Sequence, residues 1–174
     1  MGNPAETVFS SEDIQRRVAE LASEISRYYE GRRLLCLVVL RGGFFFAADL
    51  VRGLQNVKVE LEFVKLQSYA GTRSSGEVEF RGQLPVVSGR DVLVIEDLID
   101  TGLTLTALHQ ALKAQGPRSL KYAVAVKKEI ESEAEFECEY VAFRVEHSDF
   151  LVGYGMDFEG RYRTLPEIRR LSVR

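Results

Sequence analysis

The sequence lacks the features that mark a secreted, membrane-spanning or polyanion-binding protein. Its 174 residues include only two cysteines, Cys36 and Cys138, and neither has a neighbour at metal-ligand spacing. It has no run of about 18 consecutive apolar residues, and its first residues do not place an apolar segment after a basic one. The net charge of −3 provides no general attraction to nucleic acid or to an anionic membrane. We therefore expect a cytoplasmic protein with no membrane or nucleic-acid partner, in which both cysteines are buried as small apolar side chains.

The composition is typical of one folded domain. Hydrophobic residues make up 45% of the chain and charged residues 28%, and no internal repeat, linker or low-complexity tract interrupts it. A chain of 174 residues can bury a core without disulfides or a structural metal. We expect a single domain over residues 1–174.

The first half of the chain predicts a βαβ unit after an amphipathic helix. Ser10 and Asp13 form a capping-box pair ahead of apolar residues at helical spacing, up to Gly31. The run 34–40 is continuously apolar, as in a central parallel strand. It ends on Arg41-Gly42-Gly43, which a helical segment and an alternating strand follow. The expected ranges are 44–54 for this helix and 57–64 for the strand.

The second half continues the alternation of strands and helices. Residues 67–80 are small and polar, and the stretch is long enough to suggest a functional flap. A buried strand from Val92, a helix that Gly116-Pro117 closes, and a strand over 120–128 follow. The last quarter predicts short irregular strands, with Leu165 and Ile168 docking the tail. The pattern as a whole predicts an α/β fold of the doubly wound kind.

Three carboxylates and a glycine turn stand at the end of the strand that begins at Val92. Ligands of open parallel sheets bind beyond the carboxyl ends of the strands. The turn 101–104 can direct successive N–H groups and two hydroxyls at an anion, and the following helix dipole adds positive potential. A phosphate monoester fits this arrangement. The alternative is a purely structural loop, in which Asp100 or Thr101 caps the helix and Glu96 and Asp97 form an exposed acidic turn.

Two adjacent carboxylates would repel a phosphate, so we expect them to bind a different part of the ligand. The vicinal hydroxyls of a sugar donate hydrogen bonds to carboxylates, and Mg²⁺ shared between hydroxyls and phosphates prefers hard oxygen ligands. An anion site next to a diol site therefore predicts a ribose phosphate, and the strand, the carboxylates and the turn together favour this hypothesis over the capped loop.

The segment "VLVIEDLIDTGLTL" (92–105) resembles the phosphoribosyl-pyrophosphate motif of type I phosphoribosyltransferases. The segments "LRGGFFFAADL", "SYAGT", "AVKK" and "DFLVGYGMDFEGRYRTLPEI" occur in the order and spacing of the hypoxanthine-guanine phosphoribosyltransferases, so the resemblance covers roughly 34–168. It implies the type I fold, a mostly parallel twisted sheet flanked by helices with a small hood built partly from the C-terminal segment. The core would span roughly 10–145, and the hood and base-binding segment roughly 146–174.

The resemblance also implies the roles of the phosphoribosyl pyrophosphate (PRPP) site. Ribose hydroxyls would be held directly or through Mg²⁺ by Glu96 and Asp97. Asp100 would be the catalytic base that handles the purine ring proton. The pyrophosphate would meet Arg163 and the backbone of Arg41-Gly42, which has an unusual cis form in the family. The residues that would surround the 5′-phosphate are Asp100, Thr101, Gly102, Leu103 and Thr104.

The base-binding roles follow from the same resemblance. Lys127 would donate to the 6-oxo group of a purine, since an ammonium has donors only. Phe150 would stack on the purine, and the Leu151 backbone would meet its edge. Asp157 would lie near the base site, a second metal and the pyrophosphate. The flap that closes over the reacting centre would include Ser68 and Tyr69.

Three positions depart from the family pattern. Arg41 replaces a lysine, Leu103 replaces a polar or basic residue, and the flap differs from the common bacterial form. Without the resemblance, Lys127 would be interpreted as a solvated side chain and Phe150 as a core residue. Four arginines near the C-terminus would be interpreted as a solvated basic tail: Arg161, Arg163, Arg169 and Arg170.

The sequence therefore predicts a Mg²⁺-dependent purine salvage enzyme. It would transfer the phosphoribosyl group of PRPP to hypoxanthine, guanine or both, giving IMP or GMP and pyrophosphate, and would assemble as a homodimer or homotetramer. The order of preference among hypoxanthine, guanine and xanthine stays open. The alternatives are a xanthine- or uracil-preferring relative, and a PRPP-sensing regulator that binds RNA, which the acidic charge balance disfavours.

Overall fold

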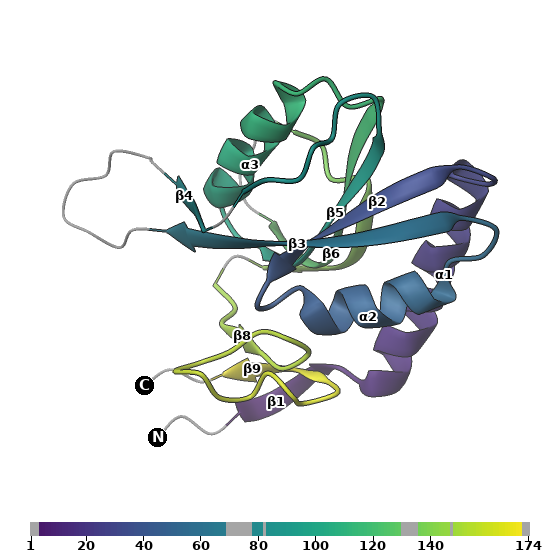
Figure 1. Cartoon of the computed structure of the whole chain (residues 1–174). Coiled ribbons are helices and arrows are strands. Elements are labelled where there is room, and N and C mark those ends of the chain that lie inside the picture. The colour runs from purple at the N-terminus through teal and green to yellow at the C-terminus, as the bar shows by residue number, and fades with distance from the viewer. Residues whose placement is uncertain (1–3, 69–77, 82, 130–135, 147, 172–174) are drawn as a thin grey trace.

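A twisted six-stranded sheet with helices on both faces forms the main body of the protein (Figure 1). The computed structural model describes residues 4–68, 78–81, 83–129, 136–146 and 148–171. The strand order is β4-β3-β2-β5-β6-β7, and every neighbouring pair is parallel except β3 with β4. The strands of this sheet are β2 (Arg33–Leu40), β3 (Lys58–Ser68), β4 (Val78–Arg81), β5 (Asp91–Ile99), β6 (Ser119–Glu129) and β7 (Tyr140–Glu146).

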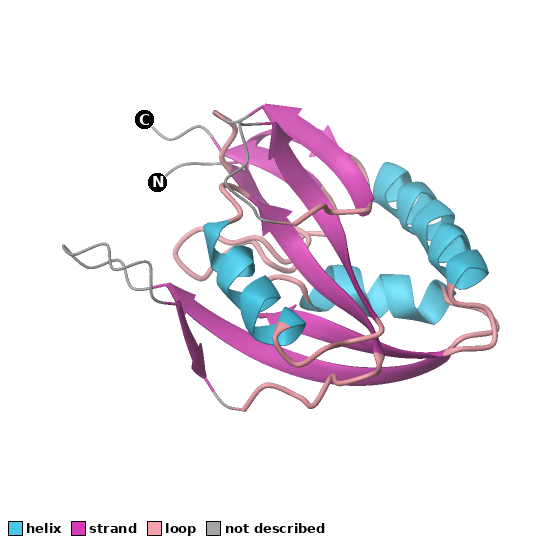
Figure 2. Cartoon of the chain, turned by 90° about the horizontal axis from the view of Figure 1, so that it is seen from above, coloured by secondary structure: helices cyan, strands magenta, loops and turns pink. Residues whose placement is uncertain are grey.

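The helices divide the core into two layers. Figure 2 shows α3 (Leu103–Lys113) on one face of the sheet, and α1 (Ser11–Tyr28) and α2 (Phe44–Gly53) on the other. One apolar cluster lies between α1, α2 and the sheet, and the other lies beneath α3. Because β2 is covered on both faces, its six residues from Leu34 to Val39 are all buried, which explains the continuous apolar run.

A small second sheet forms the hood. Its order is β1-β9-β8, from β1 (Pro4–Phe9), β9 (Ile168–Leu171) and β8 (Leu151–Val152), and both pairings are antiparallel. The first described strand therefore joins the C-terminal segment, although its partners lie more than 140 residues away along the chain. In Figure 1 this sheet lies below the main sheet, on the side of α2.

The predicted fold class is confirmed, with differences at element ends. Ser10 caps α1: its Oγ accepts from the Asp13 N–H at 3.1 Å and donates to Asp13 Oδ2 at 2.6 Å. The helix α3 ends at Lys113, before the predicted Gly116-Pro117 stop. The strand β3 runs on to Ser68, so the beginning of the predicted flap is strand, and 65–68 pair with 78–81. Strand β1 was not predicted.

Within the described ranges, no helix is long and apolar enough to cross a membrane.

Candidate active site

A cleft of about 570 Å³ opens at the carboxyl ends of β2 and β5, between the main sheet and the hood. Its walls come from the ends of β2 and β5, the turn into α3, Lys128 of β6 and several hood residues. Twelve predicted site residues line it together: Arg41, Gly42, Glu96, Asp97, Asp100, Thr101, Gly102, Thr104, Phe150, Leu151, Asp157 and Arg163. Segments far apart in the sequence thus meet at the sheet edge where parallel α/β folds bind ligands.

The turn between β5 and α3 presents backbone N–H groups to this cleft. Gly102 is the N-cap, with a left-handed φ of 84° and no side-chain cap. The Leu103 N–H has only a long bond of 3.4 Å to Thr101 Oγ1. Among the described residues, the N–H groups of Thr101, Gly102 and Thr104 have no protein acceptor. The N-cap of α3 is neither Asp100 nor Thr101, so that alternative is wrong, and the turn has the geometry that suits an anion.

Leu103 takes part in this turn through its backbone. Its side chain is half exposed and does not line the cleft. The departure from a polar residue at this position therefore leaves the N–H groups of the turn unchanged.

Glu96 and Asp97 form the acidic end of the cleft. The Asp97 N–H donates to Glu96 Oε1 at 3.0 Å. Burial raises the pKa of Glu96 well above its ordinary value, and the neighbouring Asp97 raises it further. A Cβ atom on Gly42 would lie 1.9 Å from Asp97 Oδ2, so only glycine lets the β2 loop approach this carboxylate.

The loop after β2 contains a cis peptide bond between Leu40 and Arg41. The resemblance left open whether the Arg41-Gly42 bond is cis, and the structure has the cis bond one peptide earlier. The next residue, Gly43, has no room for a side chain, because its Cβ would lie 2.8 Å from the Val39 oxygen and 2.9 Å from the Ile95 oxygen. This loop is therefore packed directly against the end of β5.

Lys128, and not Lys127, lines the cleft. Its side chain is 10% exposed, and its Nζ lies 3.3 Å from Asp100 Oδ2. Lys127 instead lies near Cys138. The pKa of the Cys138 thiol is raised to about 12, mainly by burial, and the positive charge of Lys127 acts in the opposite direction. The structure therefore does not place Lys127 at the cleft, and the base-binding role expected for it stays a prediction. Neighbouring strand residues point to opposite faces, so only one of two consecutive lysines faces the cleft.

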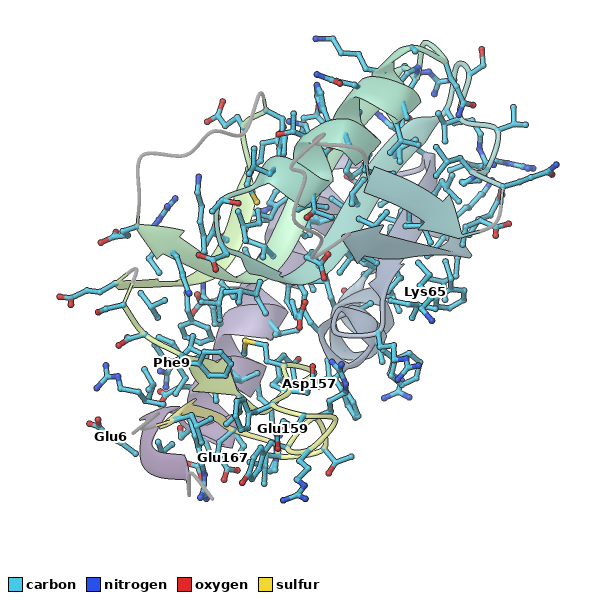
Figure 3. The ribbon with its side chains drawn as sticks, turned by 90° about the vertical axis from the view of Figure 1, so that its left-hand side faces the viewer. Glu6, Phe9, Lys65, Asp157, Glu159 and Glu167 are labelled. Carbon is cyan, nitrogen blue, oxygen red and sulfur yellow. The ribbon has the colours of Figure 1, made fainter. Side chains whose placement is uncertain are left out.

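The hood supplies the remaining wall. Phe150 is 41% exposed in the cleft, with its carbonyl held by the Leu171 N–H at 2.8 Å. Arg163 Nη2 lies 2.5 Å from Asp157 Oδ1, and the Gly160 N–H donates to Asp157 Oδ2 at 2.7 Å. Figure 3 places Asp157 at the side of the hood toward the main sheet, with Glu159 and Glu167 farther from it.

Two predicted flap residues cannot be placed in the cleft. Ser68 is the last residue of β3, of which only the backbone is described, and Tyr69 lies outside the described residues. Sequence reasoning also missed the apolar lining, which includes Leu66 of β3 and Met156 of the hood. Their apolar character alone does not distinguish them from core residues.

Glu96, Asp97 and Asp157 do not form a preformed metal cage. Within the part of the chain that the structure describes, no three His, Cys, Asp or Glu side chains are grouped to hold a metal ion. Both Asp157 oxygens already have protein partners. Glu96 and Asp97 alone offer hard oxygen donors side by side, which suits an ion that keeps waters and shares a ligand's phosphates.

The fold and the cleft are those of a type I phosphoribosyltransferase, and a model of the phosphoribosyl transferase domain matches residues 5–159. The chain is 38% identical over 163 residues to the hypoxanthine-guanine-xanthine phosphoribosyltransferase of Tritrichomonas foetus (92% of this chain, 88% of that protein). It is 40% identical over 172 residues to the hypoxanthine-guanine phosphoribosyltransferase of Dictyostelium discoideum (96% and 95%).

A solved structure of a hypoxanthine-guanine phosphoribosyltransferase from Bacillus anthracis superimposes with a TM-score of 0.88 at 35% identity, covering 98% of this chain and 99% of that one. The chain therefore belongs to the hypoxanthine-guanine phosphoribosyltransferase family. The resemblance drawn from the sequence is confirmed.

The raised pKa of Glu96 predicts a pH-dependent stability of the metal-free protein. The folded state retains a proton that the unfolded chain releases above the ordinary glutamate pKa of 4.5. The contribution of this carboxyl to the free energy of unfolding is therefore fully present below that pH, and it is lost as the pH rises through the folded-state pKa. We expect Glu96→Gln to be more stable than wild type at pH 8, by about 1.4 kcal/mol for each unit of pKa difference.

Urea unfolding in EDTA at pH 4 and pH 8 measures this effect. The gain should shrink toward pH 4, and Glu62→Gln, a change at an exposed position on β3, should show no such trend. A Glu96→Gln protein that is less stable than wild type at pH 8 would contradict the raised pKa of Glu96.

Proposed function

We propose that this enzyme transfers the 5-phosphoribosyl group of PRPP to a 6-oxopurine, hypoxanthine, guanine or both, and releases pyrophosphate. The turn 101–104 carries the proposal, because its N–H groups at Thr101, Gly102 and Thr104 have no acceptor in the described part of the chain and lie beside two carboxylates at the edge of the sheet. A 5′-phosphate at that turn directs the ribose toward Glu96 and Asp97. The anomeric carbon then faces the middle of the cleft, between Asp100 and the hood.

The opposite ends of the cleft suit the two groups that exchange at the anomeric carbon. The backbone of Arg41-Gly42 and the Arg163 guanidinium supply donors and positive charge for pyrophosphate. Phe150 offers an exposed ring face for a planar base, and Leu151 a backbone edge. A purine nitrogen attacks as pyrophosphate leaves. Positioning and charge stabilisation account for the rate, since the reaction needs no covalent intermediate.

Asp100 and Lys128 have complementary roles toward the purine. The Lys128 ammonium donates to the 6-oxo group and has no acceptor for a 6-amino group, which excludes a 6-aminopurine such as adenine. The Asp100 carboxylate accepts the proton of a purine ring nitrogen. Their separation of 3.3 Å keeps the buried ammonium paired before a base enters. Lys128 replaces Lys127 in the role that the sequence assigned.

Mg²⁺ is the metal that we propose for this site. Glu96 and Asp97 would hold it through oxygen atoms or bound water, and it would neutralise the negative charge of the pyrophosphate group. Asp157, which is paired with Arg163, would contribute from the hood only if that pair opens. The protein groups themselves bind and orient the ribose and the base.

We also propose a cytoplasmic location and a homodimer or homotetramer. Both cysteines are buried and free, as is usual in a reducing compartment. Three large apolar side chains, Phe44 of α2 and Leu61 and Phe63 of β3, are about half exposed, which favours contact with a second copy. Sedimentation should give at least twice the monomer mass, and Phe63→Asp should lower it. A monomer at all concentrations would contradict this proposal.

Xanthine is the second candidate base. The relative from Tritrichomonas foetus, whose name includes xanthine, favours it, and an additional oxo group is compatible with backbone donors near Leu151. A uracil preference has no comparable support.

Product formation from each base with PRPP tests the proposed function. Hypoxanthine or guanine should give IMP or GMP and one pyrophosphate per nucleotide, EDTA should stop the reaction, and adenine should give no product. Competition between the bases ranks hypoxanthine, guanine and xanthine. An RNA gel shift that shows tight binding without transfer of any base would favour the regulator instead.

Asp100→Asn should reduce turnover far more than it weakens PRPP binding. General acid–base catalysis contributes about 10²–10⁴-fold, so we expect kcat to fall at least a hundredfold, with KM for PRPP within about threefold. Steady-state kinetics for both substrates measures this split. An unchanged kcat would remove Asp100 from its role.

Lys128→Ala and Lys127→Ala form a matched pair. Loss of a charged hydrogen bond costs about 1.5–3 kcal/mol. Lys128→Ala should therefore raise the KM for hypoxanthine by a factor of about ten or more. Lys127→Ala should stay close to wild type. The reverse pattern would restore the assignment made from sequence.

A further inference from the structure

Tyr154 occupies an unusual position in the hood. It lies between Gly153 and Gly155, and its own φ is 48°, in the left-handed region that a bulky side chain rarely adopts. Its N–H donates to the Leu165 oxygen at 2.8 Å, so the hairpin fixes this conformation. Glycine would adopt the same backbone without steric cost. The contacts of the tyrosine side chain must therefore offset the cost of placing it here.

Those contacts join the hood to α2. The Tyr154 ring is 5% exposed and packs edge-on against Phe46, with ring centroids 6.5 Å apart. Its hydroxyl donates to Asp49 Oδ2 at 2.9 Å, across 105 residues of sequence. Burial raises the pKa of Tyr154, and the Asp49 carboxylate raises it further. The phenol therefore remains a protonated donor throughout the physiological range.

The same helix carries the loop that lines the cleft. Helix α2 begins at Phe44, directly after Arg41-Gly42-Gly43, and Asp49 follows in its second turn. The residue after Tyr154 contacts that loop: a Cβ on Gly155 would lie 2.0 Å from the Gly42 oxygen. The hood hairpin thus meets the segment from Gly42 into α2 at two points, by close backbone approach at Gly42 and by a hydrogen bond at Asp49.

The hairpin also carries the groups that face the pyrophosphate side of the cleft. The Gly155 oxygen accepts from Arg163 Nη1 at 2.6 Å, and the Gly155 N–H donates to the Arg163 oxygen at 3.0 Å. Two residues further on, Asp157 pairs with the same arginine. A shift of the hairpin relative to α2 would therefore move Arg163 and Asp157 away from Gly42 together.

We propose that Tyr154 and Asp49 are positioning residues, whose hydrogen bond sets the separation between the Gly42 backbone and the Asp157–Arg163 pair and so tunes the affinity for pyrophosphate. The inference rests on the proposed function for the identity of the ligand. Neither residue touches the cleft that binds the substrates. Their effect passes through the backbone of Gly155 and the side chain of Arg163.

The hydroxyl can be removed without disrupting the fold. Asp49 and Tyr154 line a separate cleft of about 270 Å³ between the hood, α1 and α2, and the Asp49 side chain is half exposed. In Tyr154→Phe the ring still packs on Phe46, and the Asp49 carboxylate can be hydrated in place of its lost donor. We expect the melting temperature to change little.

Titration calorimetry with pyrophosphate in Mg²⁺ buffer tests the proposal, alongside KM values for pyrophosphate and IMP in the reverse reaction. Tyr154→Phe and Asp49→Ala should each weaken pyrophosphate binding roughly tenfold, the loss expected for a charge-assisted hydrogen bond. The KM for IMP should stay within about twofold. Asp49→Asn keeps an oxygen acceptor and should restore most of the affinity.

Two further variants sharpen the test. The double variant Asp49→Ala/Tyr154→Phe should bind pyrophosphate no more weakly than either single variant, because both changes remove the same Tyr154–Asp49 hydrogen bond and the long, exposed Arg52–Asp49 pair does not reach the hood. Tyr28→Phe, a change at an exposed tyrosine of α1, should match wild type. Pyrophosphate affinity that is unchanged in Tyr154→Phe, or that falls only in step with melting temperature and IMP affinity, would overturn the inference.

The two proposals fail in different ways. If the wild-type protein transfers no phosphoribosyl group, but Tyr154→Phe binds pyrophosphate more weakly than wild type, the proposed function is refuted and the positioning role is supported. Normal transfer with unchanged pyrophosphate affinity would do the reverse.

Discussion

The backbone N–H groups at the beginning of α3 determine how the site is arranged. A helix cannot pair its first N–H groups internally, and a side-chain cap usually satisfies one of them. Here the N-cap is Gly102, which has no side chain, so these donors remain directed at the cleft. Only an anion can satisfy them while benefiting from the helix dipole. The carboxylates around the turn then have to serve other parts of the ligand.

The charges in the cleft agree with this division. Glu96, Asp97 and Asp100 follow one another along the end of β5 and the turn, while Arg41, Lys128 and Arg163 enter from three other segments. Burial and the neighbouring Asp97 raise the pKa of Glu96, as expected where two carboxyl groups lie together in a buried place. Binding energy from the ligand and Mg²⁺ would offset the cost of keeping both groups charged. The site is therefore built for its ligand more than for the stability of the empty protein.

Glycines allow the hood and the sheet to meet at this site. Gly42 approaches Asp97, and Gly155 approaches Gly42, at distances that any side chain would prevent. The hood itself depends on pairing between β1 and β9, from opposite ends of the chain. Two-stranded and three-stranded sheets of this size gain their stability from packing on a larger body, and the hydroxyl of Tyr154 on α2 is one such attachment.

The sequence predicts most of the main sheet because its signals are local. The apolar run of β2, the capping pair of α1 and the strand–turn–helix at 92–113 each lie within one segment. Strand β1 was missed because its pairing with β9 is not encoded locally. That Lys128 and not Lys127 lines the cleft could not be predicted, because a motif match does not fix the phase of a strand to one residue. The position of the cis bond and the bond between Tyr154 and Asp49 likewise depend on three-dimensional packing.

We propose that the turn 101–104 binds the 5′-phosphate of a nucleotide. A crystal structure of the protein with IMP tests it most directly. We expect phosphate oxygens within hydrogen-bond distance of the N–H groups of Thr101, Gly102 and Thr104, with the ribose hydroxyls toward Glu96 and Asp97. A bound nucleotide whose phosphate lies elsewhere, with this turn unoccupied, would contradict it.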